Sequence, residues 1–95
     1  HASKGAVINF TRAAAAEWAK YNITVNGIGP GFFVSEMTED LTKVEAFMNF
    51  VKNRCPMERL GNPGELNGAL LLLVSDASSY ITGQTIFVDG GWTAV

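Results

Sequence analysis

The stretch Ile23-Thr24-Val25-Asn26-Gly27-Ile28-Gly29-Pro30-Gly31, residues 23–31, decides the fold. Its first four residues alternate as a short strand. The next five hold three glycines and one proline, a composition typical of a loop that needs unusual dihedral angles or a close approach by another group. The sequence therefore predicts a strand over residues 23–26 that ends in a turn-rich loop.

A long helix is predicted before this stretch, over residues 2–20. Apolar side chains recur there at spacings of three and four, which is the helical period. They form one stripe: Val7, Phe10, Ala14, Trp18 and Tyr21. Ala13 to Ala16 are small, good helix formers that let another helix approach closely.

Two further helices are predicted after the stretch. The first is expected to start with a capping box at Thr42–Glu45, to bury a stripe that includes Phe47 and Val51, and to end at Pro56. The second is expected to start at Asn62, with proline at its first position, glutamate at its third and an aliphatic stripe to follow.

A second strand, Gln84 to Val88, precedes the ending Asp89-Gly90-Gly91. The predicted order is therefore helix, strand, helix, helix, strand. Strands separated by helical crossovers must run parallel to lie side by side, which implies an α/β fold. Two parallel strands do not make a stable sheet alone, so we expect one part of a doubly wound domain.

Composition and charge exclude several classes of protein. Of the 95 residues, 47% are hydrophobic and 17% are charged, which suggests apolar surface covered by another part of the chain or another subunit. The net charge of −2 argues against nucleic-acid binding. The longest aliphatic block, residues 69–74, is far shorter than the ~20 residues of a membrane span.

The cysteine and histidine content excludes other kinds of site. Cys55 is the only cysteine, so it forms no internal disulfide, which fits a reducing cytoplasm. We expect it to be a packing residue rather than a reactive thiol, because no candidate base or metal ligand stands near it in the sequence. His1 is the only histidine, so neither a histidine-based triad nor a metal site is expected.

Three groups of residues carry a resemblance to a known family. The chain opens His1-Ala2-Ser3-Lys4, and Val25-Asn26 is followed by Pro30-Gly31 and then Ser35. The tail continues with Arg59, Gly61, Pro63, Ser75-Asp76, Tyr80-Ile81-Thr82-Gly83-Gln84 and Val88-Asp89-Gly90-Gly91. In this order, across the whole chain, they resemble the short-chain dehydrogenase/reductase family. The resemblance implies a fold: residues 1–95 as the C-terminal portion of one Rossmann-like NAD(P)-binding domain, with the N-terminal half absent.

The resemblance implies that Lys4 is the catalytic lysine of a Tyr-x-x-x-Lys motif, whose tyrosine would stand just before His1. Residues four apart share one face of a helix, so the lysine ammonium can lie beside the phenol. A tyrosine has a pKa of about 10. A nearby cation lowers that pKa and lets the tyrosine exchange protons near neutral pH. Outside this context, Lys4 would be an ordinary solvent-exposed lysine.

The resemblance also implies a nicotinamide cofactor, NAD or NADP, held by Lys4, Pro30, Gly31, Phe33 and Ser35. In the family the proline and glycine line the nicotinamide pocket, and the residue at Phe33 offers backbone groups to the carboxamide. Ser35 stands where the family has a threonine that contacts the cofactor. The alternative is an ordinary turn with a helix cap at Ser35.

The implied activity is hydride transfer between the cofactor and an alcohol or ketone. Within the family, the sequence is most similar to gluconate 5-dehydrogenase-like members, followed by 3-oxoacyl-carrier-protein reductases. The chain contains no GxxxGxG phosphate loop, so alone it is expected to be inactive. Residues 32–60 would cover the substrate, and four apolar residues there could line its pocket or form core: Phe32, Met37, Phe47 and Met48.

We expect a cytoplasmic homo-oligomer, a tetramer with two-fold axes, that takes a small-molecule alcohol or ketone and binds neither nucleic acid nor membrane. An alternative from another class is a non-catalytic oligomerisation or folding module.

Overall fold

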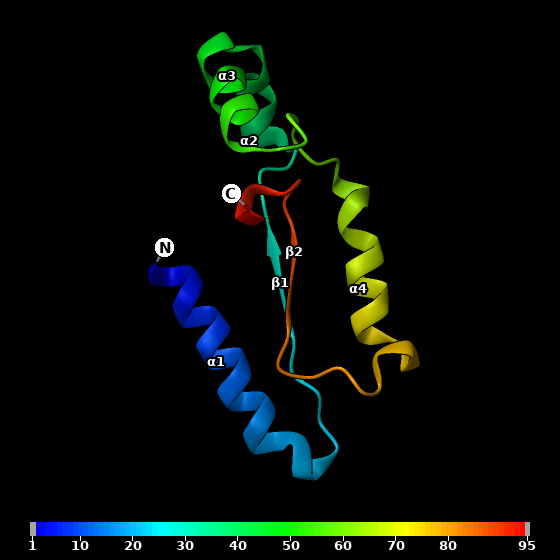
Figure 1. Ribbon diagram of the computed structural model, residues 1–95. Coiled ribbons are helices and arrows are strands. Elements are labelled where there is room, and N and C mark those ends of the chain that lie inside the picture. The colour runs from blue at the N-terminus through cyan, green and yellow to red at the C-terminus, as the bar shows by residue number, and fades with distance from the viewer. Residues whose placement is uncertain (1, 95) are drawn as a thin grey trace. The chain divides into compact units, whose positions relative to one another are not determined.

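The computed structural model describes residues 2–94, except for the side chains of residues 2, 3 and 37. The elements are α1 (Ala2–Trp18), β1 (Gly27–Pro30), α2 (Glu36–Glu39), α3 (Glu45–Arg54), α4 (Asn67–Val74) and β2 (Thr85–Val88) (Figure 1). They follow the predicted order, with the short helix α2 as an additional element that was not predicted. Short 3₁₀ turns lie between and after them: Ala19–Tyr21, Asp40–Lys43, Pro63–Leu66, Asp76–Ser78 and Trp92–Ala94. The predicted α/β class is confirmed.

The chain forms two compact units. The first comprises residues 1–29 and 68–86, and the second comprises residues 30–67 and 87–95. Both strands pass from the first unit into the second, so each unit holds one end of the strand pair.

The two strands lie side by side as a two-stranded sheet (Figure 1). The Gly27 N–H donates to the Gln84 carbonyl at 2.8 Å, and the Gly31 N–H donates to the Val88 carbonyl at 3.0 Å. The offset between donor and acceptor is the same at both ends and runs in the same direction, which is the pattern of parallel strands. The predicted parallel pairing is therefore confirmed.

The position predicted for the first strand is wrong. Residues 23–26 are not a strand, and β1 is instead formed by Gly27–Pro30, the stretch that was expected to be a loop. Glycine and proline disfavour strands by local propensity, but pairing with β2 overrides that preference. A Cβ at Gly27 would lie 3.4 Å from Thr85 Oγ1, which is an ordinary van der Waals contact, so the glycine is not required for this pairing. The predicted second strand is correct to within one residue.

Hydrogen bonds fix the residues that lead into the strands. The Val25 N–H donates to Thr82 Oγ1, and the Gly83 N–H donates to the Val25 carbonyl. The Asn26 side chain donates to the Ile81 carbonyl and accepts from the Gln84 N–H, both at 3.0 Å. These contacts extend the register of the strand pair toward its amino-terminal end.

Helix α1 is confirmed, but its apolar stripe does not form the packed face of the first unit. Thr11, Ala14 and Ala15 are the buried residues, and a Cβ at Gly83 would lie 3.4 Å from the Ala15 Cβ. Small side chains therefore face the strand-entry backbone. Four of the five stripe residues remain exposed in the structure: Val7, Phe10, Trp18 and Tyr21.

The expected capping box at Thr42–Glu45 is also wrong. Helix α3 starts after Val44, whose side chain makes no capping hydrogen bond. The Thr42 hydroxyl instead donates to the Glu39 carbonyl at 2.6 Å, because a 3₁₀ turn over Asp40–Lys43 already occupies the expected cap. The predicted start at Asn62 is confirmed, with Pro63 opening a 3₁₀ turn that leads into α4.

The second unit has a small core around α3. Val51 is 1% exposed and packs with Cys55 and Leu60. Partly buried neighbours complete the cluster: Val34, Phe47 and Trp92. The Trp92 ring lies edge-on to Phe32 at 5.1 Å between centroids, within the range at which aromatic pairs attract.

Among residues 2–94, no helix combines the length and apolar character needed to cross a membrane.

Replacing Gly90 with alanine should lower the free energy of unfolding by about 2 kcal/mol or more. Gly90 has a φ of +64°, and a Cβ there would lie 2.7 Å from the Cys55 sulfur. Urea denaturation measures the change. Gly68→Ala is the control, because a Cβ at this position in α4 meets nothing within 4 Å. It should raise stability by about 0.5–1 kcal/mol. Equal stability of the two variants would contradict the assignment of strain to Gly90.

Candidate functional site

Lys4, the predicted catalytic lysine, lies in the first part of α1 and is exposed. It belongs to the first unit, whereas the other four predicted site residues belong to the second. His1, which precedes it in the proposed motif, lies outside the described residues.

Pro30 and Gly31 lie at the carboxyl end of β1. Pro30 is exposed, and Gly31 is half-buried against the end of β2. A Cβ at Gly31 would stand 2.8 Å from both Cα and Cβ of Asp89, a distance that real Cβ atoms do not tolerate. Packing against Asp89 alone therefore requires glycine at position 31, independently of any contact with a cofactor.

Phe33 is held by a backbone bridge to Gly61. The Val34 N–H donates to the Gly61 carbonyl, and the Gly61 N–H donates to the Phe32 carbonyl, both at 2.9 Å. The Phe33 ring covers Gly61 so closely that a Cβ there would lie 2.6 Å from the ring. This bridge leaves the N–H and C=O of Phe33 itself on the opposite edge. No described residue accepts a hydrogen bond from the Phe33 N–H.

Ser35 is the N-cap of α2, so the alternative of a helix cap at this position is confirmed. Its hydroxyl accepts from the Thr38 N–H at 3.3 Å and lies 3.2 Å from the Thr38 hydroxyl. The Ser35 N–H in turn donates to Thr38 Oγ1 at 2.8 Å. Pro30, Gly31, Phe33 and Ser35 thus form one continuous segment at the carboxyl end of β1, and their contacts with a cofactor stay a prediction.

Two residues that the sequence analysis did not assign to the site organise this region. The Thr38 hydroxyl donates to the Phe33 carbonyl at 2.7 Å. The Asp89 carboxylate accepts from the N–H groups of Gly91 and Thr93 and from the Thr93 hydroxyl. The spacing Ser-x-x-Thr at 35–38 resembles a capping box and could have indicated the first. The turn ending Asp-Gly-Gly could have indicated the second.

The second unit contains a cavity of about 260 Å³. Most of its lining is apolar or backbone, and Phe32, Phe33, Met57 and Trp92 contribute side chains. Of the four apolar residues that were expected to line a pocket or to form core, Phe32 lines this cavity. Phe47 packs against the core instead, Met48 is half-buried, and the Met37 side chain lies outside the described residues.

Cys55, Arg59 and Glu65 also line this cavity. The Cys55 sulfur is buried, 3.5 Å from the Gly90 carbonyl oxygen and 3.6 Å from that of Asp89. This placement agrees with a packing role. The described residues contain no group of three or more His, Cys, Asp or Glu side chains arranged to hold a metal ion.

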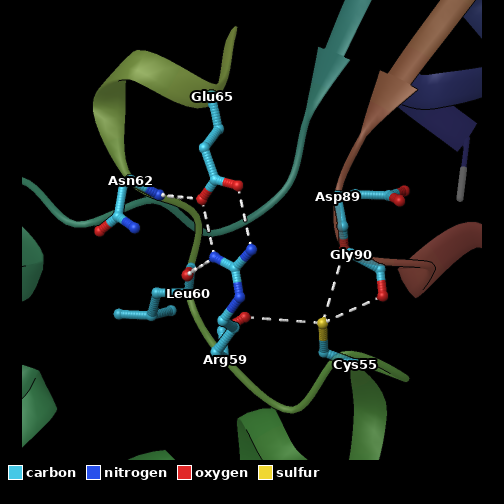
Figure 2. Close-up of polar contacts among 7 residues, drawn as sticks. All are labelled: Cys55, Arg59, Leu60, Asn62, Glu65, Asp89 and Gly90. Atoms are coloured by element: carbon cyan, nitrogen blue, oxygen red, sulfur yellow. Dashed lines mark hydrogen bonds and ion pairs between the residues drawn. The ribbon is translucent and has the colours of Figure 1, made fainter.

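Arg59 and Glu65 form a bidentate ion pair, with N–O distances of 2.7 and 2.9 Å (Figure 2). Hydrogen bonds from the Arg59 guanidinium, followed by one from the Asn62 N–H, lower the pKa of Glu65 from 4.5 to about 2. The same pairing raises the pKa of Arg59. Because each partner satisfies the other, this arginine is engaged in holding residues 59–65 together.

Comparison with known proteins gives one family and several relatives. Residues 1–93 match the family model described as enoyl-(acyl carrier protein) reductase. A 5-keto-D-gluconate 5-reductase of Escherichia coli K12 is 50% identical over 90 residues, which cover 95% of this chain and 35% of that protein. The chain thus spans about a third of the length of this relative.

Solved structures of dehydrogenases are also similar to this chain in sequence and fold. A gluconate 5-dehydrogenase from Burkholderia cenocepacia J2315, in complex with NADP and tartrate, is 44% identical with a TM-score of 0.87, covering 99% of this chain and 37% of that one. A 4-hydroxyisoleucine dehydrogenase complexed with NADH is 38% identical with a TM-score of 0.89, covering 99% of this chain and 39% of that one.

The ion pair between Arg59 and Glu65 should make stability depend on pH in a defined window. The folded-state pKa of Glu65 is lowered, so its stabilising contribution is complete above about pH 4.5 and is lost as the pH falls toward about 2. The difference in Tm between the wild type and Glu65→Gln should therefore shrink over this range. Thermal unfolding followed by circular dichroism from pH 7 to pH 2 measures it. Arg59→Gln should remove the same pH dependence, and a Tm difference that is constant with pH would contradict the pairing.

Proposed function

The chain belongs to the short-chain dehydrogenase/reductase family, and on that premise we propose that the whole protein transfers a hydride between a nicotinamide cofactor and an alcohol or ketone. The observation in the structure that carries this proposal is the Phe33 N–H, a donor without an acceptor among the described residues, in the segment that follows β1. Open α/β sheets bind their ligands at the carboxyl ends of strands.

The cofactor, NAD or NADP, supplies or accepts the hydride when bound. The residues present fit the carboxamide oxygen at its nicotinamide end, because this oxygen accepts a hydrogen bond and the Phe33 N–H offers a donor. Pro30 is exposed, and Gly31 has no side chain to block a flat ring. We assign Pro30, Gly31, Phe33 and Ser35 to this site. Both cofactors are retained in the proposal, because one solved relative contains NADP and another contains NADH.

Lys4 is proposed to assist proton transfer by the catalytic tyrosine. In the family motif it follows a tyrosine by four residues, one helical turn, so its ammonium would lie beside the phenol. The positive charge favours the phenolate and brings the tyrosine pKa closer to neutral. The tyrosine could then give a proton to a ketone oxygen or take one from an alcohol. Lys4 also belongs to the proposed cofactor contacts.

The substrate class we propose is a polyhydroxy acid of the gluconate and 5-ketogluconate type. Support comes from the 5-keto-D-gluconate 5-reductase and the gluconate 5-dehydrogenase among the relatives. Residues 32–60, which include the cavity wall at Phe32, are proposed to cover this substrate.

We further propose a cytoplasmic homo-oligomer, a tetramer with two-fold axes. Support comes from apolar side chains on α1 that the first unit leaves exposed, with Phe10 71% and Val7 56% exposed. Helix α4 adds exposed Leu71 and Val74. Apolar surface of this extent is typical of a protein interface.

Replacing Lys4 with methionine should lower kcat by at least about 100-fold, the scale expected for loss of an acid–base partner. The assay is oxidation of gluconate or reduction of 5-ketogluconate by the full protein at pH 7, followed at the absorbance of the reduced cofactor. Lys20→Met, which removes an exposed lysine from the 3₁₀ turn after α1, is the control and should leave kcat unchanged. Near-normal turnover of the Lys4 variant would contradict its catalytic role.

Replacing Phe10 with glutamate should lower the mass of the oligomer in sedimentation equilibrium, because a charge would be buried in the proposed interface. Arg12→Glu is the matched control. Arg12 is also exposed but lies on the opposite side of α1, two residues further along. A wild-type protein that sediments as a monomer, or an unchanged mass for the Phe10 variant, would contradict this interface.

A further inference from the structure

The Thr38 hydroxyl joins both ends of the short segment between Phe33 and Ser35. It donates its only proton to the Phe33 carbonyl at 2.7 Å and accepts the Ser35 N–H at 2.8 Å. A hydroxyl has one donor and two acceptor positions, so these two contacts use its proton and one lone pair. The nearby Ser35 hydroxyl, 3.2 Å away, can donate to the other. The bond to the Phe33 carbonyl is partly buried, which strengthens it relative to an exposed bond.

These contacts determine how the Phe33 residue presents its backbone. On one side, Phe33 is fixed by the bridge around Gly61 and by its ring, which lies on Gly61. On the other side, its carbonyl is taken by Thr38. The N–H and C=O of an extended residue point to the same edge of the chain. The Phe33 N–H shares a peptide group with the Phe32 carbonyl, which accepts from Gly61, and Thr38 holds the next peptide group through the Phe33 carbonyl. The two bonds together restrict rotation about Phe33 and so hold the direction of its N–H, which has no acceptor among the described residues.

We propose that Thr38 is a positioning residue for the cofactor: its hydroxyl holds the Phe33 backbone so that the Phe33 N–H donates to the carboxamide oxygen of the nicotinamide. The inference rests on the proposed function, and it adds a residue that does not itself touch the cofactor. It also separates the roles of the two hydroxyls. Ser35 caps α2, whereas Thr38 ties the backbone that carries the donor.

A purely structural role for Thr38 would have a different signature. If the hydroxyl only stabilised α2, its loss would weaken binding of every ligand in proportion to the loss of folded protein. If it orients the Phe33 N–H, its loss weakens only ligands that carry the carboxamide. ADP-ribose, which shares the rest of the cofactor but lacks nicotinamide, distinguishes the two roles.

The experiment measures equilibrium dissociation constants by isothermal titration calorimetry on the full protein. The ligands are NADH and NADPH, together with ADP-ribose and its 2′-phosphate. Thr38→Val, which keeps the shape but removes the hydroxyl, should weaken the dinucleotide that the wild type binds by about tenfold, the scale of one lost hydrogen bond. The affinity for the matching ADP-ribose should stay within about twofold of the wild type. Thr38→Ser, which retains the hydroxyl, should restore dinucleotide binding.

Thr42→Val is the matched control. The Thr42 hydroxyl also donates to a backbone carbonyl in the same segment, that of Glu39 at 2.6 Å, but contacts nothing in Phe33. It should leave both affinities unchanged. Thermal unfolding verifies that each variant is folded, and Thr38→Ala provides a second hydroxyl-free variant.

Each outcome of the titrations has a definite meaning. Equal weakening of both ligand types by Thr38→Val, or no weakening of either, would overturn the positioning role while leaving the proposed function intact. A folded wild type that binds neither NADH nor NADPH would overturn the proposed function, and this inference with it. Selective loss of the nicotinamide-containing ligand, restored by serine, is the result we expect.

Discussion

The hydrogen bonds between β1 and β2 are the constraint on which the candidate site depends. They run from Gly27 to Gln84 at one end and from Gly31 to Val88 at the other. Backbone bonds of this kind give only a modest net stability each, but leaving one unmade in a partly buried strand is costly. The register is therefore strongly held, and it fixes where the chain leaves β1. Phe33, Ser35 and Thr38 follow from that point.

Side chains around this exit are small or absent where the backbone is crowded. Gly31 passes Asp89, and Gly61 lies under the Phe33 ring. Gly90 makes room for the Cys55 sulfur. The crowding is compensated by contacts that hold the loops in place, among them the Asp89 carboxylate and the pair Arg59–Glu65. The apolar core of the second unit is limited to a few residues around Val51. Close backbone packing and a few polar interactions therefore help to stabilise this unit.

Most of the helices could be predicted from the sequence, because they depend on local signals, whereas the location of the site stays a prediction. Helical periodicity gave α1, and the Asn62-Pro63 start gave the turn into α4. The position of β1 could not be predicted, since Gly27–Pro30 becomes a strand only by pairing with a partner far along the chain. The predicted capping box at Thr42 was wrong for a related reason. The Thr42 hydroxyl donates to the Glu39 carbonyl within an adjacent 3₁₀ turn and does not cap α3. The role of Thr38 depends on a bond that closes across a turn, which residue spacing alone does not specify.

The bonds around Asn26 affect the chemical ageing of the protein. An asparagine followed by glycine is prone to deamidate, because the next backbone nitrogen can attack the side-chain carbonyl without steric hindrance. Here the Gly27 nitrogen is directed at the Gln84 carbonyl, and both ends of the Asn26 amide are held by residues 81 and 84. The attack geometry becomes accessible only when the strand pair opens. The rate at which an acidic charge accumulates at position 26 therefore records how often this end of the sheet comes apart.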